Sequence, residues 1–411
     1  MDKVIYVYAG WIPDDPQVGI YRANREHRTV MFQYDGRWIS DFGINIDPEL
    51  SLTSGWQFLS HAGTDKTFGF ISDASPDRWG RNLVRRKESH IARAEKRRAR
   101  TLMAEDYLIN ISDLGRQGGL RFKENPEGPF MSPLDDIPKM TDIRTLEQSS
   151  RILEEAADPM EYEALRDIFD PGSSLGGARP KANVRDINGN IWIAKFQSKR
   201  DYIDTGAWEM VAHDLARKCG ITVPEAQIMR IEGRSVFLSK RFDREKSMRK
   251  HMMSMMTALQ ETDSTSQDSG KGFLDMAEFI SFSGAKVKED LAELFRRTVY
   301  FVCISNTDCH FRNHALLLND DGWRLSPAYD MNPNPERDTL AINITDSDCA
   351  IDLNLVREIH PFFQLSEQEA ENIILQIKST VKENWRKTAD FYRISESEQR
   401  YMEPAFTEST R

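Results

Sequence analysis

The most informative segment of the chain is Ser305-Asn306-Thr307-Asp308-Cys309-His310-Phe311-Arg312-Asn313. It is polar, yet it follows the apolar run 294–304 and precedes the apolar run 315–318. A polar segment between two buried elements, with Asp308 and Asn313 five positions apart, is typical of a catalytic loop. An Asn- and Asp-rich turn without chemistry is the alternative interpretation.

The residue types of this loop suit phosphoryl transfer. That reaction needs a cradle for phosphates, a cation on them, Mg²⁺ held by hard oxygens, and a carboxylate that takes the acceptor's proton. We expect Asp308 to accept the proton and Asn313 to offer a side-chain oxygen to Mg²⁺. Asp330 lies beyond an expected hairpin with Asp321-Gly322 at its turn, where a second Mg²⁺ ligand belongs. The sequence Asp330-Met331-Asn332 replaces the usual Asp-Phe-Gly, so the usual Phe packing switch is not expected.

Upstream residues supply the remaining parts in a sensible order. The segment Ser173-Ser174-Leu175-Gly176-Gly177-Ala178-Arg179-Pro180-Lys181 can bring backbone N–H groups close to phosphates, although a glycine pair alone is also typical of a plain turn. Lys195 lies in an apolar strand and can contact phosphates, unless it simply faces solvent. Glu209, on the next expected helix, can pair with Lys195. The ordered set, rather than any one member, indicates the chemistry.

The hydrophobic pattern predicts an α+β protein in which a strand-rich lobe precedes a helical lobe. Strands are expected at 4–8 and 29–34, and Asn188-Gly189 predicts a hairpin between two apolar runs. Residues 76–115 read as mostly helical, and 123–140 as a Pro-rich connector. The later strands are expected at 226–231 and 235–242, and the later helices at 272–282, 288–304 and 366–390. The predicted domains are 1–140, 141–245, 246–395 and a polar tail, 396–411.

Composition narrows the class of protein. The chain has 411 residues, 39% hydrophobic and 29% charged, which indicates an ordinary globular protein. We expect no membrane span, no signal peptide and a reducing cytoplasmic location. The four cysteines form no CxxC pair, so neither a zinc site nor a disulfide framework is expected.

The charge distribution has one local exception. A formal net charge of −10 makes the chain a poor binder of bare nucleic acid. The run 78–100 is nevertheless rich in Lys and Arg. It is either a solvated helix face or a patch that touches DNA once a partner has brought the protein there.

Five motifs together resemble HipA kinases, and the resemblance covers nearly the whole chain. They are Ser75-Pro76-Asp77-Arg78-Trp79-Gly80-Arg81, Gly176-Gly177-Ala178-Arg179-Pro180-Lys181, Ser239-Lys240-Arg241-Phe242-Asp243-Arg244, Asn306-Thr307-Asp308-x-His310-x-x-Asn313 and Pro327-Ala328-Tyr329-Asp330. The resemblance implies a protein-kinase-like two-lobed fold with an extra N-terminal α/β subdomain. It implies a serine/threonine kinase that uses ATP and Mg²⁺, with Asp308 as base and Asn313 and Asp330 as metal ligands.

The same resemblance assigns the nucleotide-binding residues. Lys195 would bind phosphates together with the loop residues Ser174, Gly176, Gly177 and Lys181. Lys240 and Phe242 fall where backbone groups hold adenine, and Asp243 would approach the ribose. His310, as in the Asp-x-His-x-x-Asn loops of phosphoinositide-type kinases, would orient the loop rather than transfer protons.

Regulation and partners also follow only from the resemblance. Ser174, or its neighbour Ser173, would be autophosphorylated, which switches family members off; a phosphate there would repel those of ATP. A small helix-turn-helix antitoxin of the HipB type would bring the protein to operator DNA, and aminoacyl-tRNA synthetases are the best known target class. A small-molecule or lipid kinase, and a co-repressor module with weak chemistry, remain as alternatives.

Overall fold

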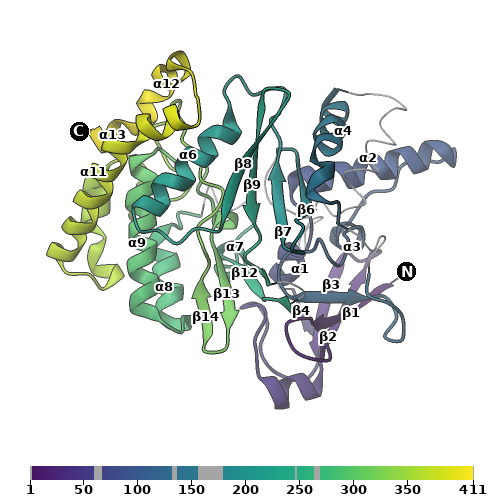
Figure 1. The fold of residues 1–411 in the computed structure, drawn as a ribbon. Coiled ribbons are helices and arrows are strands. Elements are labelled where there is room, and N and C mark those ends of the chain that lie inside the picture. The colour runs from purple at the N-terminus through teal and green to yellow at the C-terminus, as the bar shows by residue number, and fades with distance from the viewer. Residues whose placement is uncertain are drawn as a thin grey trace. The chain divides into compact units, whose positions relative to one another are not determined.

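The computed structural model describes residues 2–59, 67–131, 137–155, 179–245, 248–262 and 269–410. The chain divides into two compact units (Figure 1). Unit 1 is Met1–Lys199 with Asp243–Met253, and unit 2 is Arg200–Phe242 with Ser254–Arg411. Within the described ranges, no helix combines the length and apolar character that crossing a bilayer requires.

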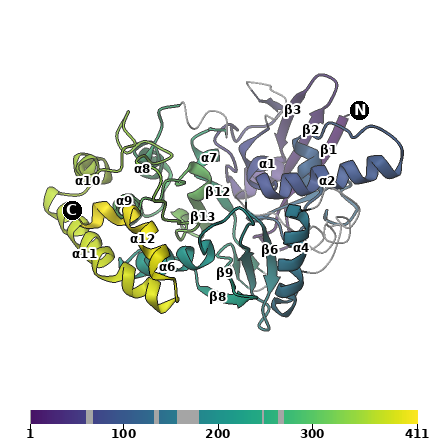
Figure 2. The same cartoon turned by 90° about the horizontal axis from the view of Figure 1, so that it is seen from above.

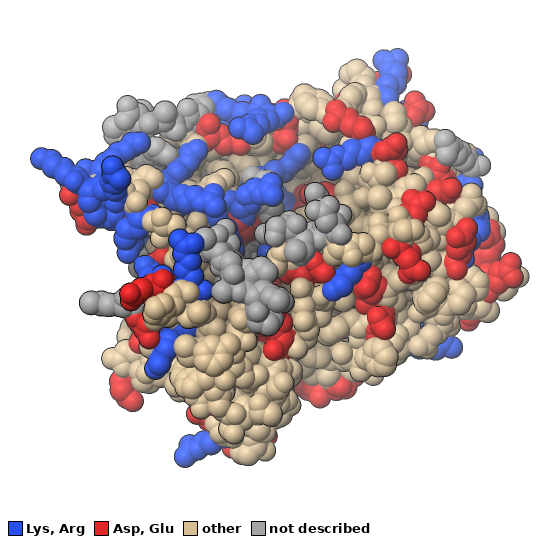
Figure 3. All heavy atoms as spheres, turned by 180° about the vertical axis from the view of Figure 1, so that it is seen from behind, with Lys and Arg blue, Asp and Glu red and all other residues tan. Residues whose placement is uncertain are grey.

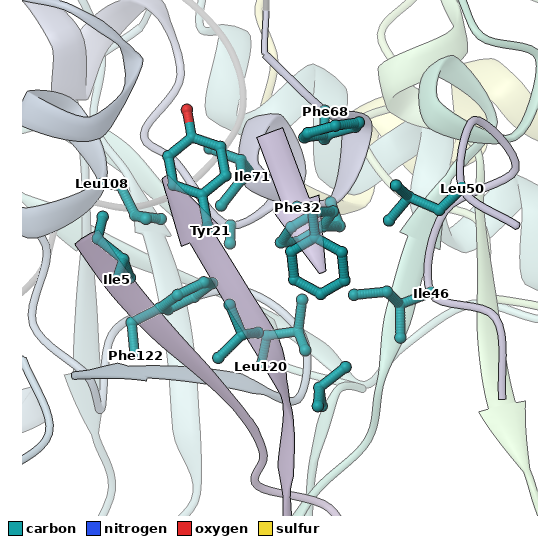
Figure 4. Packing of buried hydrophobic residues seen from close by; sticks show 14 of the residues in the cluster. Ile5, Tyr21, Phe32, Ile46, Leu50, Phe68, Ile71, Leu108, Leu120 and Phe122 are labelled. Atoms are coloured by element: carbon teal, nitrogen blue, oxygen red, sulfur yellow. The ribbon is translucent and has the colours of Figure 1, made fainter. Parts of the chain in front are cut away.

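Unit 1 contains a five-stranded antiparallel sheet of order β4-β3-β2-β1-β5. One face of it is packed into a core that includes Ile5, Phe32 and Phe122, all fully buried (Figure 4). The strands predicted at 4–8 and 29–34 are confirmed as parts of β1 and β3. The bounds are β1 (Asp2–Ala9), β2 (Gln17–Asn24), β3 (Thr29–Tyr34), β4 (Gln57–Phe58) and β5 (Leu120–Lys123).

The predicted helical region 76–115 forms two helices. The longer one starts at Asp77, whose Oδ1 accepts a hydrogen bond from Gly80 N at 2.8 Å and so caps the first turn. The helices and short turns of unit 1 are η1 (Trp38–Phe42), α1 (Gly69–Asp73), α2 (Arg78–Ala94), α3 (Ala104–Ile109), η2 (Met140–Asp142) and α4 (Ile143–Glu155).

The predicted hairpin is present as β6 (Lys181–Arg185) and β7 (Ile191–Lys195), paired antiparallel. Its connection is wider than the predicted two-residue turn. Asp186 explains the difference, because its carboxylate accepts hydrogen bonds from the backbone N of Asn188 and Asn190. Gly189 supplies the positive φ of 84° that the loop requires.

A second, later piece of chain completes unit 1. It contains β10 (Arg244–Glu245) and β11 (Met248–Arg249). The Arg244 guanidinium is buried and donates to the carbonyl of Gly118 at 2.8 Å, while Arg249 Nη2 lies 2.8 Å from Asp113 Oδ2. These buried polar contacts attach the late segment to residues more than a hundred positions earlier.

Unit 2 holds two hairpins and most of the helices. The strands are β8 (Ala226–Ile231) paired with β9 (Arg234–Lys240), and β13 (Ala315–Asn319) paired with β14 (Gly322–Leu325); β12 (Met252–Ser254) spans the unit boundary. The helices are α6 (Thr205–Lys218), α7 (Met255–Ala258), α8 (Phe273–Ser283), α9 (Val287–Cys303), α10 (Leu353–Glu358), α11 (Glu367–Phe391), α12 (Glu396–Met402) and α13 (Thr407–Thr410), with 3-10 turns η3 (Phe311–Asn313), η4 (His360–Phe363) and η5 (Glu403–Phe406). The predicted strand 226–231 and the helices predicted at 272–282, 288–304 and 366–390 are confirmed.

The long helix α11 organises this unit. It starts with a capping box, in which Ser366 and Glu369 satisfy each other's backbone N–H groups. Ile374, Ile377, Val381 and Trp385 follow the helical repeat and are buried. With this apolar stripe, α11 packs against α6 and α9 (Figure 2).

The last residues are not the polar tail that was predicted. They form α12, η5 and α13, and both Met402 and Phe406 are buried. The Phe406 ring stacks on Trp385 of α11 with centroids 4.5 Å apart. Buried apolar residues therefore attach this largely polar segment to α11.

Candidate catalytic loops

The loop that follows α9 begins where Ser305 adopts a left-handed backbone conformation, which ends the helix. Ser305 has a φ of 49°, in the left-handed region, and Asn306 N still donates to Phe301 O at 2.9 Å. The Asn306 side chain is fully buried, as are Cys309 and Phe311. From Thr307 to Asn313 buried residues alternate with more exposed ones, so every second residue of this part of the loop is packed into the interior.

Within this loop, the two residues predicted for chemistry are in contact. The Asn313 side chain donates from Nδ2 to the Asp308 carbonyl at 2.8 Å, which leaves its Oδ1 as the atom suited to a cation. The Asp308 side chain is 78% exposed, as a group that receives a proton from a substrate requires. His310 Nε2 lies 3.9 Å from Asp308 Oδ1, too far for a hydrogen bond.

Asp330 lies in a second loop that is hydrogen-bonded to the first. Asn332 N donates to Asn306 Oδ1 at 3.1 Å, and Asn334 Nδ2 donates to Thr307 Oγ1 at 2.8 Å. Asp330 itself has a φ of 56°, a conformation that aspartate tolerates better than most residues. The structure therefore brings Asp308 and Asp330 into two adjoining loops of unit 2.

Sequence reasoning gave no role to the asparagines that join these loops. Asn306 and Asn334 each bond to the opposite loop, and Asn332 presents its backbone N–H there. The available signal was the clustering of asparagine in both loops, because short amides readily satisfy backbone groups in turns.

A buried arginine that was also missed supports the second loop from α9. Arg297 is 1% exposed and pairs with Glu293 at 2.9 Å. Its Nη2 also donates to the Ser326 carbonyl at 2.6 Å, just before the segment that leads to Asp330. The signal was the position of Arg297 within the mostly apolar run 294–304, since a charge on a buried helix face needs partners.

Burial keeps the flanking titratable groups of the first loop neutral. Burial raises the pKa of the Cys309 thiol to about 12 and lowers that of His314 to about 3. The His314 ring packs edge-on against Phe273, with centroids 5.8 Å apart. Neither group therefore adds charge next to Asp308 near neutral pH.

The residues predicted to hold adenine adjoin the second loop. The Phe242 ring lies 5.5 Å from the ring of Tyr329, and the Tyr329 hydroxyl donates to the Arg312 carbonyl at 2.7 Å. The Lys240 ammonium pairs with Glu225 at 3.1 Å, and its backbone N–H donates to the Glu225 carbonyl at 2.8 Å.

Two predicted nucleotide contacts do not match their surroundings in unit 1. Lys181 is 2% exposed and its Nζ lies 3.1 Å from Asp77 Oδ2, so it joins two of the sequence motifs structurally. Asp243 is 4% exposed and accepts from Gly118 N at 2.8 Å. These buried partners argue against direct contact of Lys181 with phosphate or of Asp243 with ribose.

Two other predicted residues, Lys195 and Glu209, have defined places in the fold. Lys195 ends β7 in unit 1, opposite Lys181 in the strand register, and the buried Glu209 lies on α6 in unit 2. Their ion pair stays a prediction. Ser173, Ser174, Gly176 and Gly177 lie outside the described residues.

Comparisons with known proteins place this site in a family context. A family model described as the HipA-like C-terminal domain matches residues 173–385. "Putative kinase Y4mE" of Sinorhizobium fredii is 25% identical over 174 residues, which are 38% of this chain and 41% of that protein. The chain thus matches less than half the length of this curated relative.

A solved structure is similar over almost the entire chain. It is that of HipA from Shewanella oneidensis MR-1, determined with HipB and operator DNA. The TM-score is 0.71 at 15% identity, and the match covers 98% of this chain and 95% of that one. This likeness confirms the predicted α+β, kinase-like fold class.

Proposed function

Because this chain belongs to the family of proteins with a HipA-like C-terminal domain, we propose that it is a serine/threonine protein kinase that uses ATP and Mg²⁺. The observation that carries the proposal is the hydrogen bond from Asn332 N to Asn306 Oδ1. It joins the loop of Asp308 and Asn313 to the loop of Asp330. Phosphoryl transfer depends on such fixed placement of base and metal ligands, because the protein contributes mainly positioning and electrostatics.

The roles follow from the atoms on these loops. The exposed Asp308 carboxylate takes the proton of the acceptor hydroxyl. Asn313 Oδ1 and the Asp330 carboxylate are hard oxygen donors of the kind that Mg²⁺ selects, and they would hold it together with phosphate oxygens. When bound, Mg²⁺ neutralises charge on the transferred phosphoryl group. The Asn313–Asp308 hydrogen bond keeps base and metal ligand in one rigid turn.

The nucleotide side of the proposal rests on the sequence motifs. We assign phosphate binding to Lys195, oriented by Glu209, and adenine binding to the backbone at Lys240 and Phe242. Autophosphorylation of Ser174 or Ser173 would place about −1.5 to −2 charges where ATP phosphates belong and so switch the enzyme off.

The partners proposed are a HipB-like antitoxin, operator DNA reached through that complex, and an aminoacyl-tRNA synthetase as substrate. HipA of Shewanella oneidensis was solved with HipB and operator DNA, which supports the first two. A basic surface over α2 also supports the contact with operator DNA (Figure 3). Residues 78–100 contain ten Lys or Arg and two acidic residues. One of these, Glu88, is buried against Arg97 and Arg100, so part of the run is structural.

Transfer of labelled γ-phosphate from ATP tests the activity. The unmutated chain should become labelled in the presence of Mg²⁺, Asp308→Asn should not, and Asp320→Asn in the exposed β13–β14 turn serves as the matched control. Continued labelling of the Asp308 variant would contradict the assignment of the base. Labelling of small molecules or lipids but of no protein would favour a small-molecule kinase instead.

A further inference from the structure

The helix α12 lies beyond residue 385, where the family match ends, yet it contacts two segments that carry proposed site residues. Glu398 and Tyr401 stand three positions apart and therefore project from the same side of the helix. Each of them is hydrogen-bonded to a different part of unit 2.

Glu398 holds the start of α6. Its Oε1 accepts from Asp204 N at 2.8 Å and from the indole N–H of Trp208 at 2.9 Å. Asp204 is also the N-cap of α6, because its Oδ1 accepts from Ala207 N. The helix that begins here carries Glu209 immediately after Trp208.

Tyr401 holds the segment that follows Asp330. Its hydroxyl donates to Glu336 Oε1 at 2.7 Å, and Tyr202 donates to the same oxygen at 2.6 Å. These two donors lower the pKa of Glu336. One carboxylate thereby ties α12, the chain before α6 and the end of the second loop together.

The contact continues from Glu336 to the first loop. Glu336 N donates to Asn334 Oδ1 at 2.9 Å, and Asn334 Nδ2 donates to Thr307 Oγ1 at 2.8 Å. Thr307 immediately precedes Asp308. Three hydrogen bonds, joined through the residues Glu336 and Asn334, thus connect α12 with the neighbour of the proposed base.

Contacts with α11 and α6 hold α12 in place. Gln399 donates to Asp390 Oδ1 of α11 at 2.7 Å. The Phe406 ring, just beyond α12, lies between Trp208 of α6 and Trp385 of α11, with centroid distances of 6.1 and 4.5 Å. The views of Figures 1 and 2 agree in placing α12 beside α6 and α11.

We infer that α12 is a positioning element of the proposed kinase site, with Glu398 and Tyr401 as positioning residues. Glu398 fixes α6 and hence Glu209, while Tyr401 fixes the second loop and hence Asp330. Because both side chains stand on one rigid helix, displacement of one segment is resisted by the other. This inference rests on the proposed function, but the order that α12 imposes on the loops can be measured without it.

The test uses the full chain and the variants Tyr401→Phe, Glu398→Ala and Glu398→Gln. Arg400→Gln is the matched control, since Arg400 is on the same helix and its one ion pair within the described part of the chain is an exposed contact with Glu396 at 3.9 Å. Hydrogen–deuterium exchange of peptides covering 202–209 and 330–337 reports local opening, and kcat and KM for ATP report the site. Thermal unfolding checks that each variant keeps its fold.

We expect about tenfold faster exchange at 330–337 in Tyr401→Phe and at 202–209 in Glu398→Ala, since a hydrogen bond to a charged group is lost. The kcat of both should fall by about tenfold with little change in KM. Glu398→Gln should restore both readouts because its amide oxygen still accepts. Exchange or kcat equal to that of Arg400→Gln would overturn the inference. Absence of transfer by the unmutated chain counts against the proposed function, whereas the exchange result still decides whether α12 orders the loops.

Discussion

Replacing Asn306 by Ala removes one of the side chains that link the two catalytic loops. The Asn306 side chain is fully buried, and its Oδ1 accepts from Asn332 N at 3.1 Å. Its Nδ2 is buried and has no hydrogen-bond partner among the described residues. The substitution therefore deletes one useful hydrogen bond and one unsatisfied donor.

The expected loss of stability follows from these two atoms. A backbone N–H that loses its acceptor costs about 1–3 kcal/mol when buried, and the part-buried Asn332 N–H lies toward the lower end of that range. Removal of the unsatisfied amide N–H of Asn306 recovers part of this cost. We expect a net loss of about 1–2 kcal/mol in the free energy of unfolding. If the loss of this hydrogen bond also displaces Asp330 and raises the activation free energy by a similar amount, kcat falls by about tenfold, since 1.36 kcal/mol corresponds to a factor of ten.

Urea unfolding and steady-state phosphoryl transfer measure the two effects. Asn372→Ala, on the exposed side of α11, is the control for the same chemical change and should alter stability by less than about 0.5 kcal/mol. An Asn306→Ala variant with the urea midpoint and the kcat of the unmutated chain would refute the linkage of the loops through this side chain.

Three further predictions concern stability. Hydrogen-bonded ion pairs with Arg97 and Arg100 lower the pKa of Glu88 to about 2. The stabilisation of the fold by ionised Glu88 is therefore complete above its unfolded pKa of about 4.5 and is lost as the pH falls toward 2. Glu88→Gln should therefore lower Tm at pH 7, and the difference from the unmutated chain should shrink at pH 3. Burial lowers the pKa of His314 to about 3 in the folded chain, against about 6.5 when unfolded. The free energy of unfolding should therefore fall by about 1.4 kcal/mol per pH unit as the pH drops from about 6.5 to about 3. Urea midpoints measured across this range should fall less steeply for His314→Phe. Phe406→Ala should cost about 3–5 kcal/mol, seen as a large drop in Tm, because the ring is buried between two indoles.

The loops of the site could be predicted because apolar runs mark both of their ends. The run before Ser305 became α9 and the run after Asn313 became β13, so the polar residues between them had to form a connection. Periodicity also sufficed for β1 and α11, where the repeat persists over several residues. The family resemblance then supplied the fold class, which the superposition confirms.

Contacts between distant residues could not be predicted in this way. Lys181 was expected at a phosphate, but its partner Asp77 lies about a hundred positions earlier and no local pattern links them. Asp243 was likewise assigned to ribose, but it is buried and its Oδ2 accepts from Gly118 N. The helix around Tyr401 was missed because its few apolar residues are spread among charged ones, and only tertiary packing makes it stable.

The late segment Asp243–Met253 has a consequence for synthesis on the ribosome. Unit 1 cannot be completed when its first 199 residues have emerged, because Asp113 and the carbonyl of Gly118 still lack Arg249 and Arg244. During that interval the first part of unit 2 is already being translated. Nascent chains shorter than about 253 residues, and truncated fragments of the same length, therefore expose buried polar groups and should depend on chaperones more than the finished protein does.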